Sequence, residues 1–380
     1  MKKSYLMIAA VATTLAACSN IDTFKDVNTQ EMPIAFEQAL NKTTRSAITN
    51  AETLADNGGF VVYGYNTAVK ESNAYVWTSP VTVFNAIDVT SNDNGATWAT
   101  SVTRFWNKNA SYNFYAIAPA NTTAKAKYGI KQGTGATDLK FTITGAESAI
   151  YTASQDYLID RDGAKGVTYE TSTNGTVAMD FHHIMAKIQV KLKSSLNPGK
   201  NEAGQNTSAK ITVTSLTMEG WDKNTGNFSQ VRVVTPTELT AQDEWTLATT
   251  EQTKGNVTLI PSVSDNTQAS IELTCGDAND IEDVADWYIM VPQVIAANGL
   301  KFTLTYTYVN DNGTPSNATD DYTETFENQT ATITTAQTWG TDSHTTYTLD
   351  VKPSAIDFSV TVCGFGHDNT IVTPDDVEVK

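Results

Sequence analysis

Residues that could carry catalysis or bind a metal ion are few and widely spaced in this chain of 380 residues. The chain has four histidines and three cysteines. His182 and His183 are adjacent, but the residues around them follow no common metal-ligand spacing, and the cysteines show no nucleophile-and-base arrangement. We therefore expect no enzymatic activity, no metal ion and no cofactor.

Two further groups of residues could bind ligands. The segments SNDNG (91–95) and VNDNG (309–313) offer the oxygen ligands that calcium prefers. Neither continues to the distal glutamate of an EF-hand, so we expect Asn-Gly turns there, and an Asp-Gly turn at 162–163. Four tryptophans could stack on sugars or fill a core, and the sequence leaves both readings open: Trp77, Trp98, Trp106 and Trp221.

The N-terminal segment has the pattern of an export signal that ends at Cys18. Two lysines, an apolar run from Tyr5 to Val11 and a series of small residues precede this cysteine, a pattern typical of a secretory signal that is too short to span a bilayer. The ending Leu-Ala-Ala-Cys resembles the bacterial lipobox, so residues 1–18 are predicted to be a lipoprotein signal with its lipobox: the peptide before Cys18 is removed and Cys18 is lipidated. The alternative is an ordinary signal-peptidase site.

Arg45 is a second candidate for processing. It is the only arginine in the first 100 residues, and it lies in the polar, threonine-rich stretch NKTTRSAITN. No proline flanks the bond to Ser46, so the local sequence suits a trypsin-like protease. The alternative is a solvated linker arginine. A cut after Arg45 makes Ser46 the new N-terminus and removes residues 19–45.

Composition limits the partners of the chain. The formal net charge is −17 at pH 7. This charge argues against nucleic acid and against an anionic membrane surface as binding partners. Beyond the signal, no segment is long and apolar enough to cross a membrane.

Short runs of alternating apolar residues indicate a chain that is nearly all β. The clearest predicted strands are residues 60–65, 112–119, 139–144, 209–218, 255–261, 300–309 and 355–362, whereas helix signals are confined to 33–41 and 277–287. Strands at this spacing, without helices between them, predict β-sandwiches or barrels, and the length predicts two domains. We place the boundary near residue 178, which gives domains at 46–178 and 179–380.

One predicted strand begins the second of these domains. In FHHIMAKIQVKL (181–192), Ile184, Ile188 and Leu192 share one phase, and Gln189, Lys191 and Lys193 are expected to face solvent. Cys275 is expected to face inward in the run IELTC, and a disulfide between Cys275 and Cys363 is left open.

An ordered set of motifs resembles a known family. The lipobox, PIAF before Thr-Thr-Arg, FVVYGY, YNFYAIAP, FHHIMAKIQVKL and IDFSVTV together resemble the fimbrillin family of Bacteroidales, the shaft subunits of type V pili. The resemblance implies two tandem transthyretin-like β-sandwich domains. It also implies an outer-membrane lipoprotein precursor that an arginine-specific protease matures, with Arg45 at the cleavage position, and a mature protein in an extracellular fimbria.

This resemblance suggests how the chain could polymerise. Before cleavage, PIAF could fill a groove as a strand, and its removal would expose an edge for a strand from another copy. Two C-terminal segments alternate suitably for such a donor strand, one with Ile356, Phe358, Val360 and Val362 and the other with Ile371, Val377 and Val379. Residues 355–363 could instead be the last strand of the C-terminal sandwich.

The predicted function is therefore a pilin of an adhesive surface filament, built by donor-strand exchange. Its expected partners are other copies and related pilins, the maturing protease, anchor and tip subunits, and surface ligands. Alternative functions are a pilus anchor that keeps its lipid, a tip adhesin that lacks a donor strand, and a monomeric surface lipoprotein that binds glycans.

Overall fold

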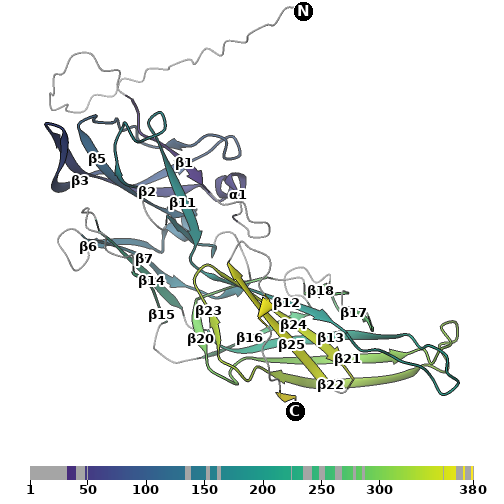
Figure 1. The fold of residues 1–380 in the computed structure, drawn as a ribbon. Coiled ribbons are helices and arrows are strands. Elements are labelled where there is room, and N and C mark those ends of the chain that lie inside the picture. Colours follow the sequence, from purple (N-terminus) through teal and green to yellow (C-terminus); the bar gives the residue numbers. More distant parts are fainter. Residues whose placement is uncertain are drawn as a thin grey trace, which may run out of the picture.

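The computed structural model describes most of the chain after residue 31. The described residues are 32–39, 48, 50–132, 138–150, 155–160, 164–223, 225–233, 242–247, 253–261, 268–276, 280–284, 287–353, 355–364, 371–372 and 378–379. Figure 1 shows an elongated molecule, with the early strands in one lobe and the late strands in the other. Short helices are α1 (Ala51–Asp56) and α2 (Thr122–Lys125). The predicted all-β class with packed sheets is confirmed.

The largest sheet forms the N-terminal lobe. Its order is β1-β11-β9-β5-β2-β3-β4, and β10 also pairs with β5. The strands are β1 (Ala35–Ala39), β2 (Phe60–Glu71), β3 (Ala74–Thr90), β4 (Ala99–Thr100), β5 (Ala110–Ala118), β9 (Leu158–Asp160), β10 (Ala164–Val167) and β11 (Thr176–His183). The core on one face includes Phe60, Val62, Phe84, Phe114 and Phe181.

A four-stranded sheet covers the other face of β2 and β5. Its order is β15-β14-β7-β6, from β6 (Tyr128–Gln132), β7 (Asp138–Ala146), β14 (Gly226–Val233) and β15 (Gln242–Leu247). Between the two sheets lie Val61, Tyr63 and Tyr115 from the first, with Phe141 and Phe228 from the second. The β14–β15 hairpin follows residue 178 in sequence, yet it pairs with β7. The domain limits at 178 and 179 remain a prediction.

The C-terminal lobe packs two sheets over the largest core. One sheet has the order β26-β25-β24-β12-β19-β8, with β18 also on β12, and the other has the order β16-β13-β21-β22-β27, with β17 on β13; β20 and β23 form a separate pair. The strands are β8 (Ala149–Ile150), β12 (Ala186–Lys193), β13 (Ala209–Asp222), β16 (Lys254–Ile260), β17 (Ile271–Thr274), β18 (Glu282–Asp283), β19 (Tyr288–Met290), β20 (Gln293–Ile295), β21 (Lys301–Asn310), β22 (Tyr322–Thr332), β23 (Gln337–Trp339), β24 (Ser343–Lys352), β25 (Ala355–Gly364), β26 (Ile371–Val372) and β27 (Glu378–Val379).

Every strand named above from the sequence is present, but other local expectations were wrong. Residues 35–39 form a strand, not a helix, because Ile34 and Phe36 alternate into the core. The described part of 277–287 contains the short strand β18 and no helix. The helix α1 was missed, although Asn50 and Thr53 form a capping box at its start.

The strand predicted at 181–192 is interrupted. β11 ends at His183 and β12 begins at Ala186, so the run joins the two lobes. β12 lies inside its sheet with both faces covered, and Gln189 is therefore buried, contrary to the prediction. Lys187 is buried too, with its ammonium 3.4 Å from the centre of the Trp287 ring. Lys191 and Lys193 are partly exposed, as predicted.

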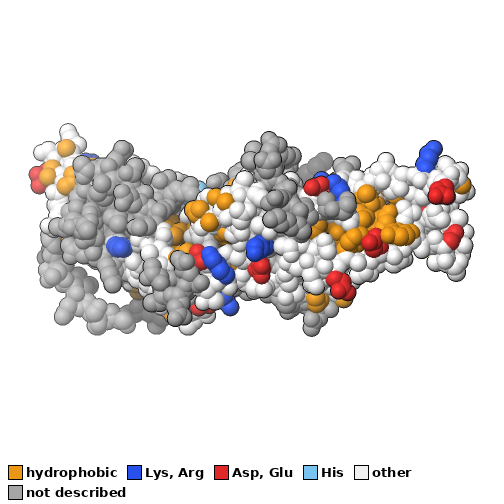
Figure 2. Space-filling model, turned by 90° about the horizontal axis from the view of Figure 1, so that it is seen from below, with side chains coloured by type: hydrophobic (Ala, Val, Ile, Leu, Met, Phe, Trp, Pro, Cys, Tyr) orange, Lys and Arg blue, Asp and Glu red, His pale blue; other side chains and the backbone are white. Residues whose placement is uncertain are grey.

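In the view of Figure 2, the visible lysine, arginine, aspartate and glutamate side chains lie scattered, with no large cluster of one sign. The Asn-Gly pairs at 94–95 and 312–313 have positive φ, as the predicted turns require, whereas 162–163 lies outside the described residues. Within the described part of the chain, no helix is long and apolar enough to cross a bilayer.

Candidate functional site

The strand β1 closes the N-terminal sheet on itself. On one side it pairs in parallel with β11, and Ala35 N–H donates to the Gly175 carbonyl at 3.1 Å. On the other side, Ile34 N–H donates to the Arg104 carbonyl at 2.8 Å, and Trp106 N–H donates to the Met32 carbonyl at 3.0 Å. The segment Met32–Ala39 is thus hydrogen-bonded between two walls, one of β11 and one of residues 104–106 after β4.

Side chains of this segment alternate between the core and solvent. Ile34 and Phe36 are each 3% exposed, whereas Glu37 is exposed. The Phe36 ring meets the rings of Phe84 and Phe114 edge to face, each at 5.4 Å between centroids. The two walls, with the rings of Phe84 and Phe114 as a floor between them, therefore form a groove. This groove accepts a strand that has apolar side chains at every second position. We name this the leader groove.

Two glycines shape the leader groove. A Cβ on Gly64 would lie 2.8 Å from the Phe84 ring and 2.9 Å from the Phe114 ring, so glycine lets these aromatic rings form the floor. Gly175 has φ of +83°, and a Cβ there would lie 2.9 Å from Cγ of Met32. The Gly175 carbonyl also accepts the indole N–H of Trp106 at 2.9 Å, which ties the two walls together.

The structure describes only part of the predicted processing and donor sites. Cys18, Arg45 and Ser46 lie outside the described residues, as does Val377. Sequence reasoning identified PIAF as a groove-filling strand but missed the wall at 104–106 and the floor. Trp106 was considered only as a sugar-stacking or core residue, because nothing in the local sequence indicates which strand an irregular segment will meet.

The first donor candidate is part of the C-terminal sandwich. β25 pairs with β24 from Ser343↔Gly364 to Lys352↔Ala355. Ile356 and Val360 are buried in the core of this lobe, and Val362 is 38% exposed. Phe358 lies on the same strand, opposite Leu349. Removing these residues from their own lobe would therefore expose its core.

The second donor candidate is held by short pairings. In β26, Ile371 is opposite Thr361 and Val372 is opposite Val360 on β25. In β27, Val379 is opposite Ala331 on β22, in the facing sheet. Over the described residues of this tail, β26 and β27 each form two residue pairs, whereas β25 forms ten with β24.

The two adjacent histidines contact aspartate side chains of the same chain. His183 Nδ1 lies 2.6 Å from Oδ1 of Asp156, and both residues are buried. His182 contacts Asp180 at 3.2 Å and Asp342 at 3.7 Å. Over the described residues, no group of three or more histidine, cysteine, aspartate or glutamate side chains could hold a metal ion.

Other sequence candidates also have structural explanations. Asp93 binds its own loop, accepting Thr97 Oγ1 at 2.6 Å, Thr97 N–H at 2.8 Å and Ser91 Oγ at 2.7 Å. These hydrogen bonds lower the pKa of Asp93 to about 2. Cys275 faces inward as predicted and forms no disulfide, and burial raises the pKa of its thiol.

The tryptophans divide between core and surface. Trp106 and Trp221 are buried, and Trp98 packs against Phe60. Trp77, on β3, is 37% exposed and is the one of the four predicted candidates with an open ring.

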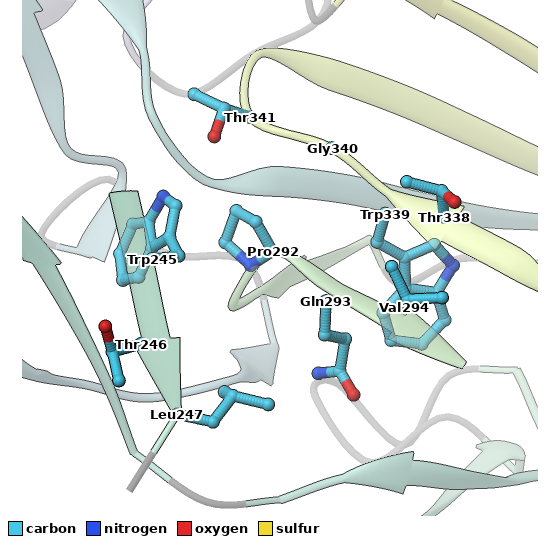
Figure 3. Close-up of a pocket in the computed structure, with 10 residues that line it drawn as sticks. All are labelled: Trp245, Thr246, Leu247, Pro292, Gln293, Val294, Thr338, Trp339, Gly340 and Thr341. Atoms are coloured by element: carbon cyan, nitrogen blue, oxygen red, sulfur yellow. The ribbon is translucent and has the colours of Figure 1, made fainter. Parts of the chain in front are cut away.

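An open pocket lies near the junction of the lobes. It has a volume of about 550 Å³ and is lined by residues that include Trp245, Pro292, Gln293, Val294 and Trp339. Figure 3 shows Trp245 and Trp339 on either side of Pro292. Both indole N–H groups are already used, by the Ile184 carbonyl and the Tyr347 hydroxyl, and Gln293 binds Asp222. These three polar side chains of the lining are thus already paired within the protein.

Comparisons with known proteins agree with the motifs. The family described as fimbrillin-like matches residues 44–363. A curated relative, "Fimbrium subunit Fim1C" of Phocaeicola vulgatus, is 26% identical over 226 residues, which cover 57% of this chain and 56% of the relative. The chain thus matches little more than half the length of that relative.

A solved structure shares the fold. The crystal structure of a fimbrial protein from Bacteroides vulgatus aligns with a TM-score of 0.58 at 17% identity, covering 88% of this chain and 99% of that one. The family match spans most of the chain, including both lobes and the strand β25. The chain therefore belongs to the fimbrillin-like family.

Proposed function

We propose that the chain is a structural subunit of a cell-surface fimbria that polymerises by strand exchange. Its family membership and the relative described as a fimbrium subunit support the fimbrial role. In this proposal the precursor is an outer-membrane lipoprotein attached through Cys18. An arginine-specific endopeptidase cuts after Arg45, and the mature chain begins at Ser46 and assembles in the extracellular filament.

The observation that carries the proposal is the position of β1 in the chain. Ala35–Ala39 fills the leader groove, yet it precedes Arg45 in sequence. A cut after Arg45 therefore breaks the covalent link between the groove and its occupant. Once that occupant leaves, both walls have unpaired backbone groups and the pockets of Ile34 and Phe36 are empty, which makes the groove an acceptor for a new strand.

A strand from another copy restores what the cut removes. Burying one Ile and one Phe side chain stabilises the assembly by about 1.5–3 kcal/mol each, in addition to the backbone ladder. We assign the donor to the tail from Ile371 to Val379 because β26 and β27 are held by short pairings, whereas Ile356 and Val360 on β25 belong to a core. A contact between the groove of one copy and the tail of the next is heterologous and extends into a filament.

The test is to isolate the protein from the cell surface and measure its mass, its N-terminal sequence and its mobility with and without heating. We expect a chain that starts at Ser46 and runs as a heat-sensitive ladder. Arg45→Ala should abolish the ladder, whereas the matched control Lys42→Ala should leave it intact. An acylated monomer that retains Cys18 and residues 19–45 would contradict the proposal.

A further inference from the structure

We propose that the bond between Arg104 and Phe105 is a second, latent cleavage site for an arginine-specific endopeptidase, protected only while a strand fills the leader groove. The inference rests on the proposed function in one respect, namely that the groove is emptied during maturation. It adds that a subunit whose groove stays empty, because no donor strand enters it, is cut at this second site.

The residues around this bond are accessible from solvent. Between β4 and β5, positions 101–109 are exposed or partly exposed, apart from Trp106. The Arg104 side chain is exposed, and Phe105 is 46% exposed. Exposed connections of this kind are preferred sites of proteolysis. Because the Arg104 and Phe105 side chains are exposed, burial does not protect the bond between them from a protease.

Backbone pairing provides the protection instead. Endopeptidases bind the substrate backbone as an extended strand and place the carbonyl before the scissile bond in an oxyanion hole. Here the Arg104 carbonyl already accepts Ile34 N–H at 2.8 Å, and Trp106 N–H donates to Met32 at 3.0 Å. Phe105 itself forms an antiparallel bridge with Pro33. While these pairings persist, the bond cannot enter a protease site.

Departure of β1 releases the carbonyl and the amide together. The Trp106 indole still donates to Gly175, and Arg104 Nε still donates to the Val83 carbonyl at 3.2 Å. These anchors hold the segment at the surface of the sheet, with its edge free to pair with a protease. A donor strand that enters the groove occupies the same edge and restores the protection.

Cleavage at this bond would remove an empty subunit from assembly. Water supplies a hydroxyl to the Arg104 carbonyl carbon and a proton to the Phe105 nitrogen, and the endopeptidase supplies the catalytic groups. The break falls in one wall of the groove, between the carbonyl that paired with Ile34 and the amide that paired with Met32. A cut subunit therefore loses a continuous acceptor edge, whereas a filled subunit stays intact.

The experiment opens the groove without using an arginine. In the full chain, residues 41–46 are replaced by the recognition sequence of an unrelated site-specific protease, which also removes Arg45. The purified protein is treated with an arginine-specific endopeptidase before and after opening, and the fragment ending at Arg104 is followed by mass spectrometry. We expect this fragment to form at least ten-fold faster after opening.

Added peptides test whether occupancy is the cause. A synthetic peptide of residues 31–40 should slow the cut at Arg104 in the opened chain, whereas the same peptide with Ile34→Asp and Phe36→Asp should not. Arg104→Lys should abolish this fragment. Arg232→Lys is the matched control and should change nothing, because Arg232 lies in β14 between β7 and β15.

Equal rates before and after opening would overturn the inference, as would an opened chain that resists cutting at Arg104. An opened chain that is cut equally fast with either peptide would overturn it as well. Since the opening is engineered, none of these outcomes depends on Arg45. Failure of natural maturation at Arg45 is detected separately, from the N-terminus of the native protein.

Discussion

Phe36 is the side chain that most closely links the leader strand to the rest of the protein. It is buried and meets Phe84 and Phe114, two aromatic residues from different strands of the same sheet. Residues this well packed have large effects on stability when truncated. At this position the effect also depends on whether the strand is still covalently attached.

The first prediction concerns Phe36→Ala. In the uncut precursor it should lower the free energy of unfolding by about 3–5 kcal/mol, because a buried aromatic side chain is lost. Glu37→Ala, at the exposed neighbouring position, should change it by about 0.5 kcal/mol or less. Urea denaturation of both variants measures the difference. An unchanged midpoint for Phe36→Ala would show that β1 does not stabilise the N-terminal lobe.

The second prediction concerns Asp93 and pH. The bonds from Thr97 and Ser91 lower its pKa from 3.8 to about 2 in the folded chain, so the carboxylate contributes stability above about pH 4. This contribution should decrease as the pH falls from about 4 through 2, because the carboxyl group is protonated first in the unfolded chain and at lower pH in the folded chain. Titration of Asp93 by NMR should give a pKa near 2.

A matched measurement tests the same point by stability. Asp93→Ala should destabilise the protein at pH 6 and have a smaller effect near pH 2.5. If Asp93→Ala lowered the free energy of unfolding equally at both pH values, the assigned hydrogen bonds would be contradicted.

At the scale of elements, the two C-terminal donor candidates differ in how they are held. β25 is paired along its length and supplies Ile356 and Val360 to a core, whereas β26 and β27 reach two different sheets with two residue pairs each. Over the described residues, the tail thus has fewer strand pairings than β25, which is why the proposed donor role is assigned to it.

The third prediction is that truncation after Gly364 separates folding from assembly. The truncated chain should keep its β-sheet circular dichroism spectrum and lose only a few degrees of melting temperature. It should form no heat-sensitive ladder. Val360→Asp in the full chain is the contrasting variant, because it places a charge in the core and should unfold the C-terminal lobe. If the truncated chain still formed a ladder, the donor strand would be β25 and not the tail.

At the scale of the whole molecule, the lobes share strands across the middle of the sequence. The β14–β15 hairpin pairs with β7, and Phe228 and Trp245 pack with the side chains of β2 and β5. Ile289 and Val291, from β19 and the residue after it, join the same core. Folding of the N-terminal lobe therefore depends on residues far beyond position 178.

The fourth prediction is that a fragment of residues 46–178 does not fold, because the outer face of β2 and β5 would have lost its cover. Expression of this fragment should give insoluble protein or a spectrum without dispersed amide resonances. In the full chain, Phe228→Ala should lower the free energy of unfolding by about 3–5 kcal/mol. A soluble fragment with a cooperative melting transition would support the domain boundary predicted at 178.

The β architecture and part of the candidate site could be predicted from local sequence patterns. Alternation in FVVYGY, YNFYAIAP and LKFTLTYTYV predicted strands β2, β5 and β21, because side chains on a strand repeat every two residues. The same alternation in PIAF allowed a groove-filling strand, although the nearby run also looked helical. Alternation depends only on neighbouring residues within one strand, so it can be recognised from the sequence alone.

The pairing of strands that are distant in the sequence is visible only in the tertiary structure. Nothing near Arg104 in the sequence predicts that its carbonyl pairs with Ile34, or that the hairpin from Gly226 to Leu247 returns to β7. Strand pairing between distant segments depends on how the whole sheet curls and which faces must be covered. Gln189 and Lys187 are buried for the same reason, because the strand β12 lies inside a sheet that is covered on both sides.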